Sequence, residues 1–408
     1  MINHPLSIVW RALCWAVLFT VTSFAQAQSY DSLRVSLLTV DPSPTEVYTI
    51  YGHTALRCYD PANQIDAVLN WGMFDAHIPN FIYHFIKGET DYFFAQIPYN
   101  VFIREYSWKN ATITEQVLNI PDVEKAGLVQ FIATNLEPEN REYRYNFLFD
   151  NCTTRPRDLI EKYCGGTLIY PKQTEPATFR KLIHSCTNPY PWMTFGIDLL
   201  IGSGADSLIS QHQELFLPEK LKDALDLATI TTSTGEKYPI VLSSQILVGE
   251  KQPENNSASA HFLLSSCLLS PLGIGILAAL CFSILAVTTY KRKSCVSRWP
   301  FALLLFAAGA AGCLIAFICL FSEHPCTAPN WNLLWLHPLH WIGMVGFFLK
   351  KPYPLIRWYH SINIIVLVIL LAAWPCIPQA LSIANIPFIG CLIFASIYGL
   401  LALKRKRS

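Results

Sequence analysis

Long apolar runs dominate the last third of the chain, whereas short apolar runs alternate with polar turns before it. Each long run approaches or exceeds the roughly 20 residues that a helix needs to cross a hydrocarbon core. The third and fourth are the shortest, and the third contains His337, Pro338 and His340. The pattern predicts an all-α membrane domain, residues 262–408, of five transmembrane helices. These spans are 262–290, 299–321, 332–349, 358–374 and 381–403.

The preceding segment, residues 28–249, mixes two hydrophobic periods and is predicted to be an α+β domain. A turn cluster at 60–63 joins two predicted strands into a hairpin. Strands are expected at 32–40, 48–59, 66–72, 113–120 and 238–248, and helices at 122–136, 158–163 and 216–228. The polar stretch 250–261 is predicted to be a linker to the membrane.

The first 27 residues resemble a secretory signal peptide. Arg11 precedes an apolar run at 12–24, and Ala25-Gln26-Ala27 forms a small-x-small cleavage site. No cysteine follows that site, so this is not a lipoprotein signal. We expect cleavage after Ala27 and export of the α+β domain.

Charge divides the chain into two opposite parts. Residues 28–261 contain 18 Lys and Arg against 28 Asp and Glu, whereas residues 262–408 contain 11 against one acid, Glu323. The basic residues follow spans one, three and five, and the connections 322–331 and 375–380 contain none. The positive-inside rule then places the C-terminus in the cytoplasm and the α+β domain in the periplasm, with the spans in the inner membrane. Because the basic residues adjoin apolar spans, we do not expect nucleic-acid binding.

Two side chains in the exported domain suggest nucleophilic chemistry. Cys152 follows Asn151 at the predicted start of a helix, and His53 stands at the start of a predicted strand. A helix N-terminus and a nearby imidazolium both stabilise a thiolate. Backbone N–H groups at the same helix start could hold the oxyanion of a tetrahedral intermediate. A third group should orient the imidazole: Asn70 on the next strand, or Asp66 as its competitor.

Disulfide formation is the alternative for Cys152. The exported domain has four cysteines in an oxidising compartment, Cys58, Cys152, Cys164 and Cys186. A bridge from Cys152 to Cys164 is disfavoured, because one helix would separate them by about 18 Å, whereas a bridge needs roughly 7 Å. Cys164 with Cys186 stays feasible.

Two further cysteines, Cys326 and Cys376, fall in the connections that the charge pattern places outside the cytoplasm. They either form a disulfide or remain two free thiols. No spacing of metal-ligating residues and no glycine-rich phosphate loop is present in the sequence. We therefore expect neither a metal nor a cofactor.

Three stretches resemble the Bacteroides-type apolipoprotein N-acyltransferases (Lnb), and the likeness extends to residues 330–335 and Pro338. The stretches are Tyr51-Gly52-His53-Thr54-Ala55-Leu56-Arg57, Asn70-Trp71-Gly72-Met73-Phe74 and residues 145–158, which include Asn151-Cys152-Thr153-Thr154-Arg155. The order of histidine before cysteine also resembles the circularly permuted papain-like fold of lecithin:retinol acyltransferase.

The resemblance implies transfer of a fatty acyl chain from a phospholipid to the α-amine of a lipoprotein's diacylglyceryl cysteine. Phospholipid, diacylglyceryl apolipoproteins and the membrane would be the partners. By position, Cys152 would be the nucleophile, His53 the base and Asn70 the third catalytic residue. Other residues of these motifs are expected to contribute to substrate binding: Tyr51, Trp71, Asn151, Thr153 and Arg155.

Two other functions stay open at this point. A papain-like peptidase or amidase of the cell envelope would use the same residues, although it needs no membrane domain of this size. A non-catalytic membrane scaffold would use His53 and Cys152 only structurally. The apolar stretch 191–201 is either a core helix or a membrane-facing wall of an acyl groove leading to Cys152.

Overall fold

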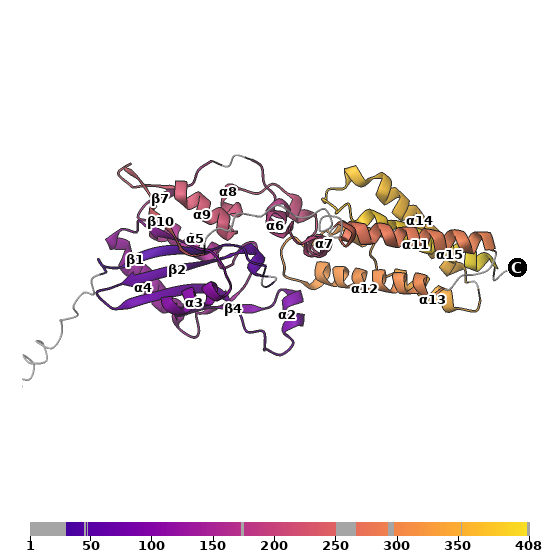
Figure 1. The fold of residues 1–408 in the computed structure, drawn as a ribbon, viewed down its shortest axis with the longest axis horizontal. Coiled ribbons are helices and arrows are strands. Elements are labelled where there is room, and N and C mark those ends of the chain that lie inside the picture. Colours follow the sequence, from indigo (N-terminus) through magenta and orange to yellow (C-terminus); the bar gives the residue numbers. More distant parts are fainter. Residues whose placement is uncertain are drawn as a thin grey trace, which may run out of the picture.

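The computed structural model shows an α+β domain at one end of an elongated helical bundle (Figure 1). It describes residues 30–44, 46, 48–172, 175–249, 267–292, 298–351 and 353–405. The predicted signal peptide and linker lie outside these residues. The α+β domain and the helical domain after it agree with the predicted order.

A seven-stranded antiparallel sheet is the centre of the exported domain, in the order β10-β5-β1-β2-β3-β4-β6. Its strands are β1 (Arg34–Val40), β2 (His53–Asp60), β3 (Ile65–Met73), β4 (Asp91–Pro98), β5 (Ile113–Leu118), β6 (Glu142–Arg144) and β10 (Val241–Val248). A smaller sheet contains β7 (Thr167–Ile169), β8 (Thr229–Thr231) and β9 (Lys237–Pro239). The stretch predicted as one strand over 238–248 is thus divided between the two sheets.

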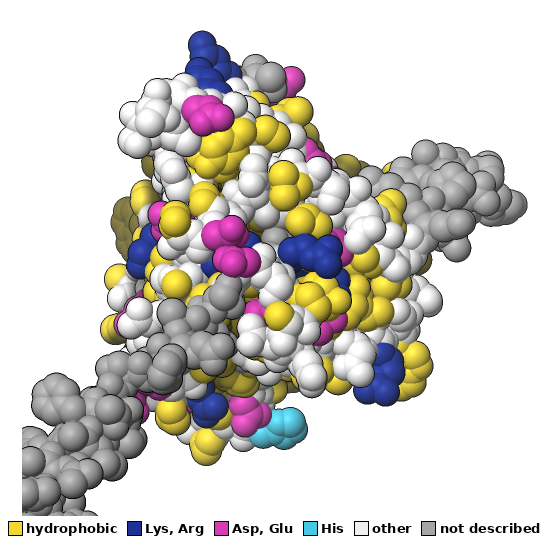
Figure 2. Space-filling model, turned by 90° about the vertical axis from the view of Figure 1, so that its left-hand side faces the viewer, with side chains coloured by type: hydrophobic (Ala, Val, Ile, Leu, Met, Phe, Trp, Pro, Cys, Tyr) yellow, Lys and Arg dark blue, Asp and Glu magenta, His cyan; other side chains and the backbone are white. Residues whose placement is uncertain are grey.

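Helices of the exported domain either cover a face of the large sheet or pack beside the sheet. They are α2 (Phe81–Lys87), α3 (Tyr99–Trp108), α4 (Asp122–Leu136), α5 (Thr154–Tyr163), α6 (Phe179–Thr187), α7 (Pro191–Leu200), α8 (Gln211–Glu214) and α9 (Pro218–Leu227). The main core forms where α4, α5 and α9 pack on one face, and Phe102 of α3 packs against Leu38 and Val68 on the other. At the end of the domain that faces away from the bundle, acidic and basic side chains are interspersed with apolar ones (Figure 2).

The strand that carries His53 begins later than its sequence pattern predicts. Residues Thr49–Tyr51 form a 3-10 turn, and Gly52 then adopts φ +76°. A Cβ atom at Gly52 would lie 2.6 Å from the carbonyl oxygen of Val40, so only glycine fits there. The turn makes His53 the first residue of β2, at the end of the sheet.

The membrane domain has four helices among the described residues that are long and apolar enough to cross a bilayer. The bundle consists of α11 (Pro271–Arg292), α12 (Trp299–Phe321), α13 (His340–Phe348), α14 (Pro354–Ala372) and α15 (Asn385–Arg405). The third predicted span is therefore wrong as a continuous helix. Its first part is a 3-10 turn, Trp331–Leu334, and α13 has nine residues, about 14 Å.

Side chains explain why this third segment is not helical throughout. Non-helical backbone at membrane depth must be hydrogen-bonded within the protein. His340 Nε2 donates to the Trp335 carbonyl at 2.8 Å, and Asn332 Oδ1 accepts from Trp335 Nε1 at 2.9 Å. Asn332 Nδ2 donates to the carbonyl of Asp198 in the exported domain at 2.9 Å. The irregular turn thus contributes to the junction between the two domains.

The apolar stretch at 191–201 forms α7, which lies between the domains (Figure 1). Leu199 packs against the core of the bundle, the Phe195 and Phe388 rings are 5.7 Å apart, and Trp192 Nε1 donates to the Leu269 carbonyl at 2.8 Å. Ile197 faces the exported domain's own core. The helix therefore joins the two domains, and its predicted role as an acyl-groove wall stays a prediction.

The exported domain sits at one end of the bundle, and the C-terminus lies at the other (Figure 1). Both connections without Lys or Arg reach the exported domain: Glu323 N donates to the Lys87 carbonyl at 2.7 Å, and Ala380 N donates to Asp206 at 3.2 Å. The charge-derived topology requires this arrangement.

The described cysteines are all free thiols, so the disulfides considered from the sequence are absent. Cys164 lies in the main core, whereas Cys186 packs against a separate cluster that contains Phe179 and Phe216. Cys326 packs against that same cluster, while Cys376 is exposed in a short turn of the membrane domain. Each potential pair is thus divided between different packing environments.

Candidate active site

Cys152 lies in the turn that leads into α5, and Asn151 fixes this turn. Asn151 Oδ1 accepts hydrogen bonds from the backbone N–H groups of Thr153 at 2.7 Å and Thr154 at 2.9 Å. Its Nδ2 donates to the carbonyls of Phe147 and Phe216, and its own N–H donates to Thr154 Oγ1. These bonds satisfy the free N–H groups at a helix start and hold Cys152 in one position.

His53 and Asn70 meet across the β2–β3 hairpin. Asn70 lies directly opposite Ala55, so it is the diagonal neighbour of His53 on the same face. His53 Nε2 donates to Asn70 Oδ1 at 3.0 Å, and a hydrogen bond with the Cys152 side chain raises the pKa of His53. The structure thus brings together His53, Asn70 and Cys152.

A bulge in β3 makes room for the cysteine. The pairing of β3 with β4 shifts between Asn70 and Met73, and Gly72 within this bulge adopts φ +84°. A Cβ atom on Gly72 would lie 3.3 Å from Cys152 Cβ and 3.4 Å from the Tyr145 ring. Glycine at this position lets the start of α5 approach the end of the sheet.

The electrostatics favour an ion pair between thiol and imidazole. Burial alone raises the pKa of a thiol, but the charge of His53 and its hydrogen bond outweigh burial and lower the pKa of Cys152 below its usual 9.0. Burial lowers the pKa of an imidazole, but the charge of Cys152 and hydrogen bonds to Cys152 and Asn70 raise the pKa of His53 above 6.5. Each side chain therefore stabilises the charged form of the other.

Thr54 supports this pair and was not singled out from the sequence. Its backbone N–H donates to the Cys152 sulfur, which also lowers the pKa of Cys152. Its hydroxyl lies 3.1 Å from that of Thr153, and both side chains are fully buried. Thr54 follows His53 directly, so the strand that supplies the imidazole also supplies a donor to the thiolate. Only the folded hairpin reveals that donor.

The structure separates the two sequence candidates for the third group. Asp66 forms a two-pronged ion pair with Arg57 at 2.8 and 2.9 Å, and Arg57 also contacts Glu115. Asn70 is buried and orients His53 instead. The Asn70 Nδ2 atom has no hydrogen-bond partner within the described part of the chain.

The residues expected to bind substrate lie in structural positions around the pair. Trp71 is buried and stacks on Phe94 in the main core, at 4.5 Å between ring centroids. Arg155 forms a two-pronged ion pair with Asp150, at 2.6 and 2.8 Å. Tyr51 packs edge-on against Phe147, while Thr153 and Asn151 are buried in the turn. Their predicted role in substrate binding stays a prediction.

Some of the backbone N–H groups predicted to bind the oxyanion already donate to another acceptor. The N–H groups of Thr153 and Thr154 are occupied by Asn151 Oδ1. The N–H of Cys152 itself makes no hydrogen bond within the described residues. Asn70 Nδ2 is the other donor of this cluster that has no partner within the described residues.

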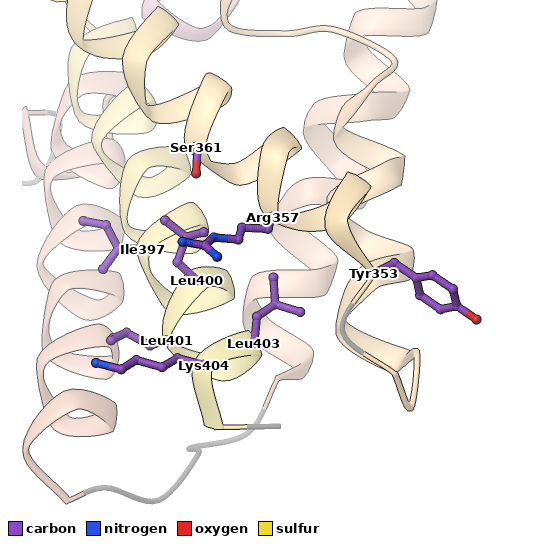
Figure 3. A pocket seen from close by; sticks show the side chains of 8 residues that line it. All are labelled: Tyr353, Arg357, Ser361, Ile397, Leu400, Leu401, Leu403 and Lys404. Carbon is purple, nitrogen blue, oxygen red and sulfur yellow. The ribbon is translucent and has the colours of Figure 1, made fainter. Parts of the chain in front are cut away.

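Two other features lie apart from this site. Asp158, Glu161 and His212 place ligand atoms within 4.8 Å of one another, but Arg157 and the His212–Glu161 contact already occupy these groups. A cavity of about 560 Å³ opens between α14 and α15, at the end of the bundle remote from Cys152. Its lining combines leucines with Arg357, Ser361 and Lys404 (Figure 3).

Comparison with protein families gives two matches. Residues 22–185 match the Lnb N-terminal periplasmic domain, and residues 264–407 match the Lnb transmembrane domain. The chain belongs to the Lnb family. The transmembrane model is named for five helices, so the short α13 with its preceding turn corresponds to the third of them. Searches of curated proteins and of solved structures gave no match.

Membership of the Lnb family agrees with a membrane protein that carries a periplasmic domain, and it suggests a lipoprotein N-acyltransferase. The periplasmic match includes His53, Asn70 and Cys152. All three residues of the cluster therefore fall within one family domain.

Proposed function

We propose that this Lnb-family chain transfers a fatty acyl chain from a membrane phospholipid to the α-amine of a lipoprotein's diacylglyceryl cysteine. The observation that carries the proposal is the position of the Cys152–His53–Asn70 cluster, in a domain docked on one end of a membrane bundle. A thiolate can accept an acyl group from an ester and pass it to an amine.

In the first half-reaction, the Cys152 thiolate attacks the carbonyl carbon of a phospholipid ester. The tetrahedral oxyanion accepts hydrogen bonds from the Cys152 N–H and Asn70 Nδ2. The bond from carbon to the glycerol oxygen breaks, and the His53 imidazolium gives its proton to that oxygen. Lysophospholipid leaves, and the acyl group remains on Cys152 as a thioester.

In the second half-reaction, the lipoprotein's α-amine enters in its neutral form after losing its ammonium proton to solvent, and the neutral His53 accepts the proton that the attacking nitrogen releases. The amine attacks the thioester, an amide bond forms, and the carbon–sulfur bond breaks. Cys152 leaves as a thiolate beside the imidazolium, which restores the starting ion pair. Asn70 holds the ring so that Nδ1 faces sulfur in both steps.

The membrane anchor fits two lipid-linked substrates. Because both are confined to the bilayer plane, an enzyme fixed in that plane meets them at raised effective concentration. The proposal places the bundle in the inner membrane, the cluster in the periplasm and the C-terminus in the cytoplasm. What supports this orientation is the location of the exported domain at the end without basic connections. We also propose that the exported domain has a permuted papain-like fold.

A mass spectrum of the intact protein tests the proposal. Incubation with phospholipid should add one acyl mass that maps to Cys152, and a diacylglyceryl peptide should then remove it. Cys58→Ala should acquire the same adduct, because Cys58 is buried in the core. Cleavage of wall peptides without any acyl adduct would overturn the proposal in favour of a peptidase. A complete lack of both activities would favour a scaffold.

A further inference from the structure

Helix α2 presents apolar side chains to the exterior. No residue of this helix is buried, and Ile82, Tyr83 and Phe85 are exposed by 72%, 51% and 48%. Ile78, just before the helix, is exposed as well. Clustered exposed side chains of this kind mark a contact with a membrane or ligand.

This apolar face continues the surface of a membrane span. The Tyr83 ring lies 6.3 Å from that of Phe317 in α12, and Phe85 lies 5.8 Å from His324. Leu320 and Phe321, in the last turn of α12, are exposed by 74% and 60%. Helix α2 lies beside this end of α12 (Figure 1), and the exposed side chains of the two helices thus belong to one apolar surface.

Hydrogen bonds hold α2 beside the end of α12. Ser322 Oγ donates to the Ile86 carbonyl at 2.8 Å, and His324 Nε2 donates to the Phe85 carbonyl at 2.6 Å. A Cβ atom at Gly88, where φ is +72°, would lie 2.9 Å from His324 N. The end of α2 is therefore in close contact with the chain just after a membrane span.

A row of aromatic rings leads from α2 to the cysteine. Successive ring centroids are separated by 6.0 Å, 5.7 Å, 5.2 Å and 4.2 Å. The row consists of Phe85, Phe81, Phe74, Tyr92 and Tyr145. Its last ring, Tyr145, lies beside Gly72, and Gly72 lies against Cys152.

Exposure decreases from Phe85 to Tyr92, and the last ring, Tyr145, is partly buried. Phe85 is 48% exposed, Phe81 and Phe74 are partly buried, and Tyr92 is 8% exposed. An acyl chain that enters at the exposed end would pass from the exposed ring of Phe85 to the buried ring of Tyr92. Aromatic side chains also favour the interface between lipid and water.

We propose that α2 lies in the outer leaflet and that this aromatic row receives the acyl chain of the donor phospholipid and directs its ester toward Cys152. The acyl route to Cys152 rests on the proposed acyl transfer. The position of α2 in the bilayer is independent of the chemistry. The occupant is a long acyl chain, because the row extends an apolar surface that already faces lipid.

Helix α7 also contacts the bundle, but it offers a different surface. Its Ile197 packs into a filled cluster with Phe179, Leu182 and Phe216, and its Leu199 packs into the bundle core. Ile197 and Leu199 are thus in contact with protein, whereas Trp192 and Leu200, near the two ends of α7, are exposed. The open apolar surface that connects the bundle with the cysteine lies at α2.

The first experiment measures bilayer contact without relying on activity. A photoreactive benzoylphenylalanine is placed at Ile82, in full-length protein reconstituted in phosphatidylethanolamine–phosphatidylglycerol vesicles. The matched control position is Leu227 in α9, which is 70% exposed. Crosslinks to phospholipid should form at position 82 and not at 227. Equal crosslinking at both positions, or none at 82, would overturn the placement of α2.

The second experiment measures the acyl route. The double variant Ile82→Ser/Phe85→Ser should lose at least about tenfold in transfer from long-chain phospholipid. It should keep acylation of Cys152 by a soluble short-chain thioester, together with the wild-type rate of iodoacetamide labelling. Leu227→Ser should resemble wild type in all three assays.

The outcomes separate this inference from the proposed function. Equal losses on the long-chain and soluble substrates, or no loss on either, would overturn the route. If wild type forms no acyl adduct on Cys152 at all, the proposed function fails. The crosslinks at position 82 would still decide where α2 lies.

Discussion

Two sulfur atoms, near opposite ends of β2, lie in opposite chemical environments. Near the start of the strand, Cys152 lies beside His53 and the Thr54 amide, and its pKa falls below the usual 9.0. Near the other end, Cys58 lies in the main core, and burial raises its pKa to about 12. Cys58 is buried and Cys152 is partly buried, and only Cys152 has a charged partner that lowers its pKa.

The largest expected effect separates these two sulfurs by activity. Cys152→Ser should lower acyl transfer by at least about 10³-fold, because a hydroxyl forms no comparable anion beside His53. Cys58→Ala should keep activity within a few-fold of wild type. Transfer from phospholipid by purified protein is the measurement. Near-normal activity of Cys152→Ser would assign the nucleophile to another residue.

Removal of the charged partner should make the active thiol resemble the core thiol. His53→Ala should lower transfer by roughly 10² to 10⁴, the usual contribution of a positioned acid or base. Without the imidazolium, burial is the main remaining influence, so the pKa of Cys152 should rise. The midpoint of iodoacetamide labelling against pH, below 9.0 in wild type, should move upward. An unchanged midpoint would show that the two side chains do not form a pair.

Replacement of Asn70 should change the pKa of His53 in the same pair. Its hydrogen bond raises the pKa of His53, so Asn70→Ala should lower that pKa and move the alkaline limb of activity to lower pH. We expect a loss of about tenfold to a hundredfold from the misplaced ring. Asn70→Asp, which restores an acceptor and adds negative charge, should move the limb upward. Identical pH profiles for both variants would mean that Asn70 is not a positioning residue.

The sequence predicts the fold best where one hydrophobic period dominates. Helix α4 and span α12 have the predicted bounds, 122–136 and 299–321. The strand expected over 48–59 begins only at His53, because the left-handed Gly52 interrupts it. The third span loses its first half as helix where His340 bonds the carbonyl of Trp335 and Asn332 bonds the carbonyl of Asp198 in the other domain. Such tertiary hydrogen bonds are not visible in hydrophobic periodicity.

Site residues are predictable where local sequence places them. Cys152 at a helix start and His53 at a strand start follow from motif and period, and the hairpin brings Asn70 opposite Ala55. The amide of Thr54 and the approach of Gly72 depend on how α5 meets the sheet, so they emerge only from the fold. A motif also does not distinguish contact with substrate from support, as the core position of Trp71 illustrates.

The smallest expected effect concerns Asn151, the other support of the cysteine turn. Asn151→Ala removes the acceptor for two N–H groups and the donor to two carbonyls, so the free energy of unfolding should fall by about 1–3 kcal/mol. Because His53 and Thr54 remain, the labelling midpoint of Cys152 should rise less than in His53→Ala.

Asn151→Asp sharpens this test. It keeps the acceptor for the two N–H groups but adds a negative charge next to the thiol, so stability should fall less than in the alanine variant while the labelling midpoint rises more. Chemical denaturation and labelling of the same samples measure both quantities. If Asn151→Ala raised the midpoint as much as His53→Ala does, the helix start, and not the imidazolium, would be what distinguishes Cys152 from Cys58.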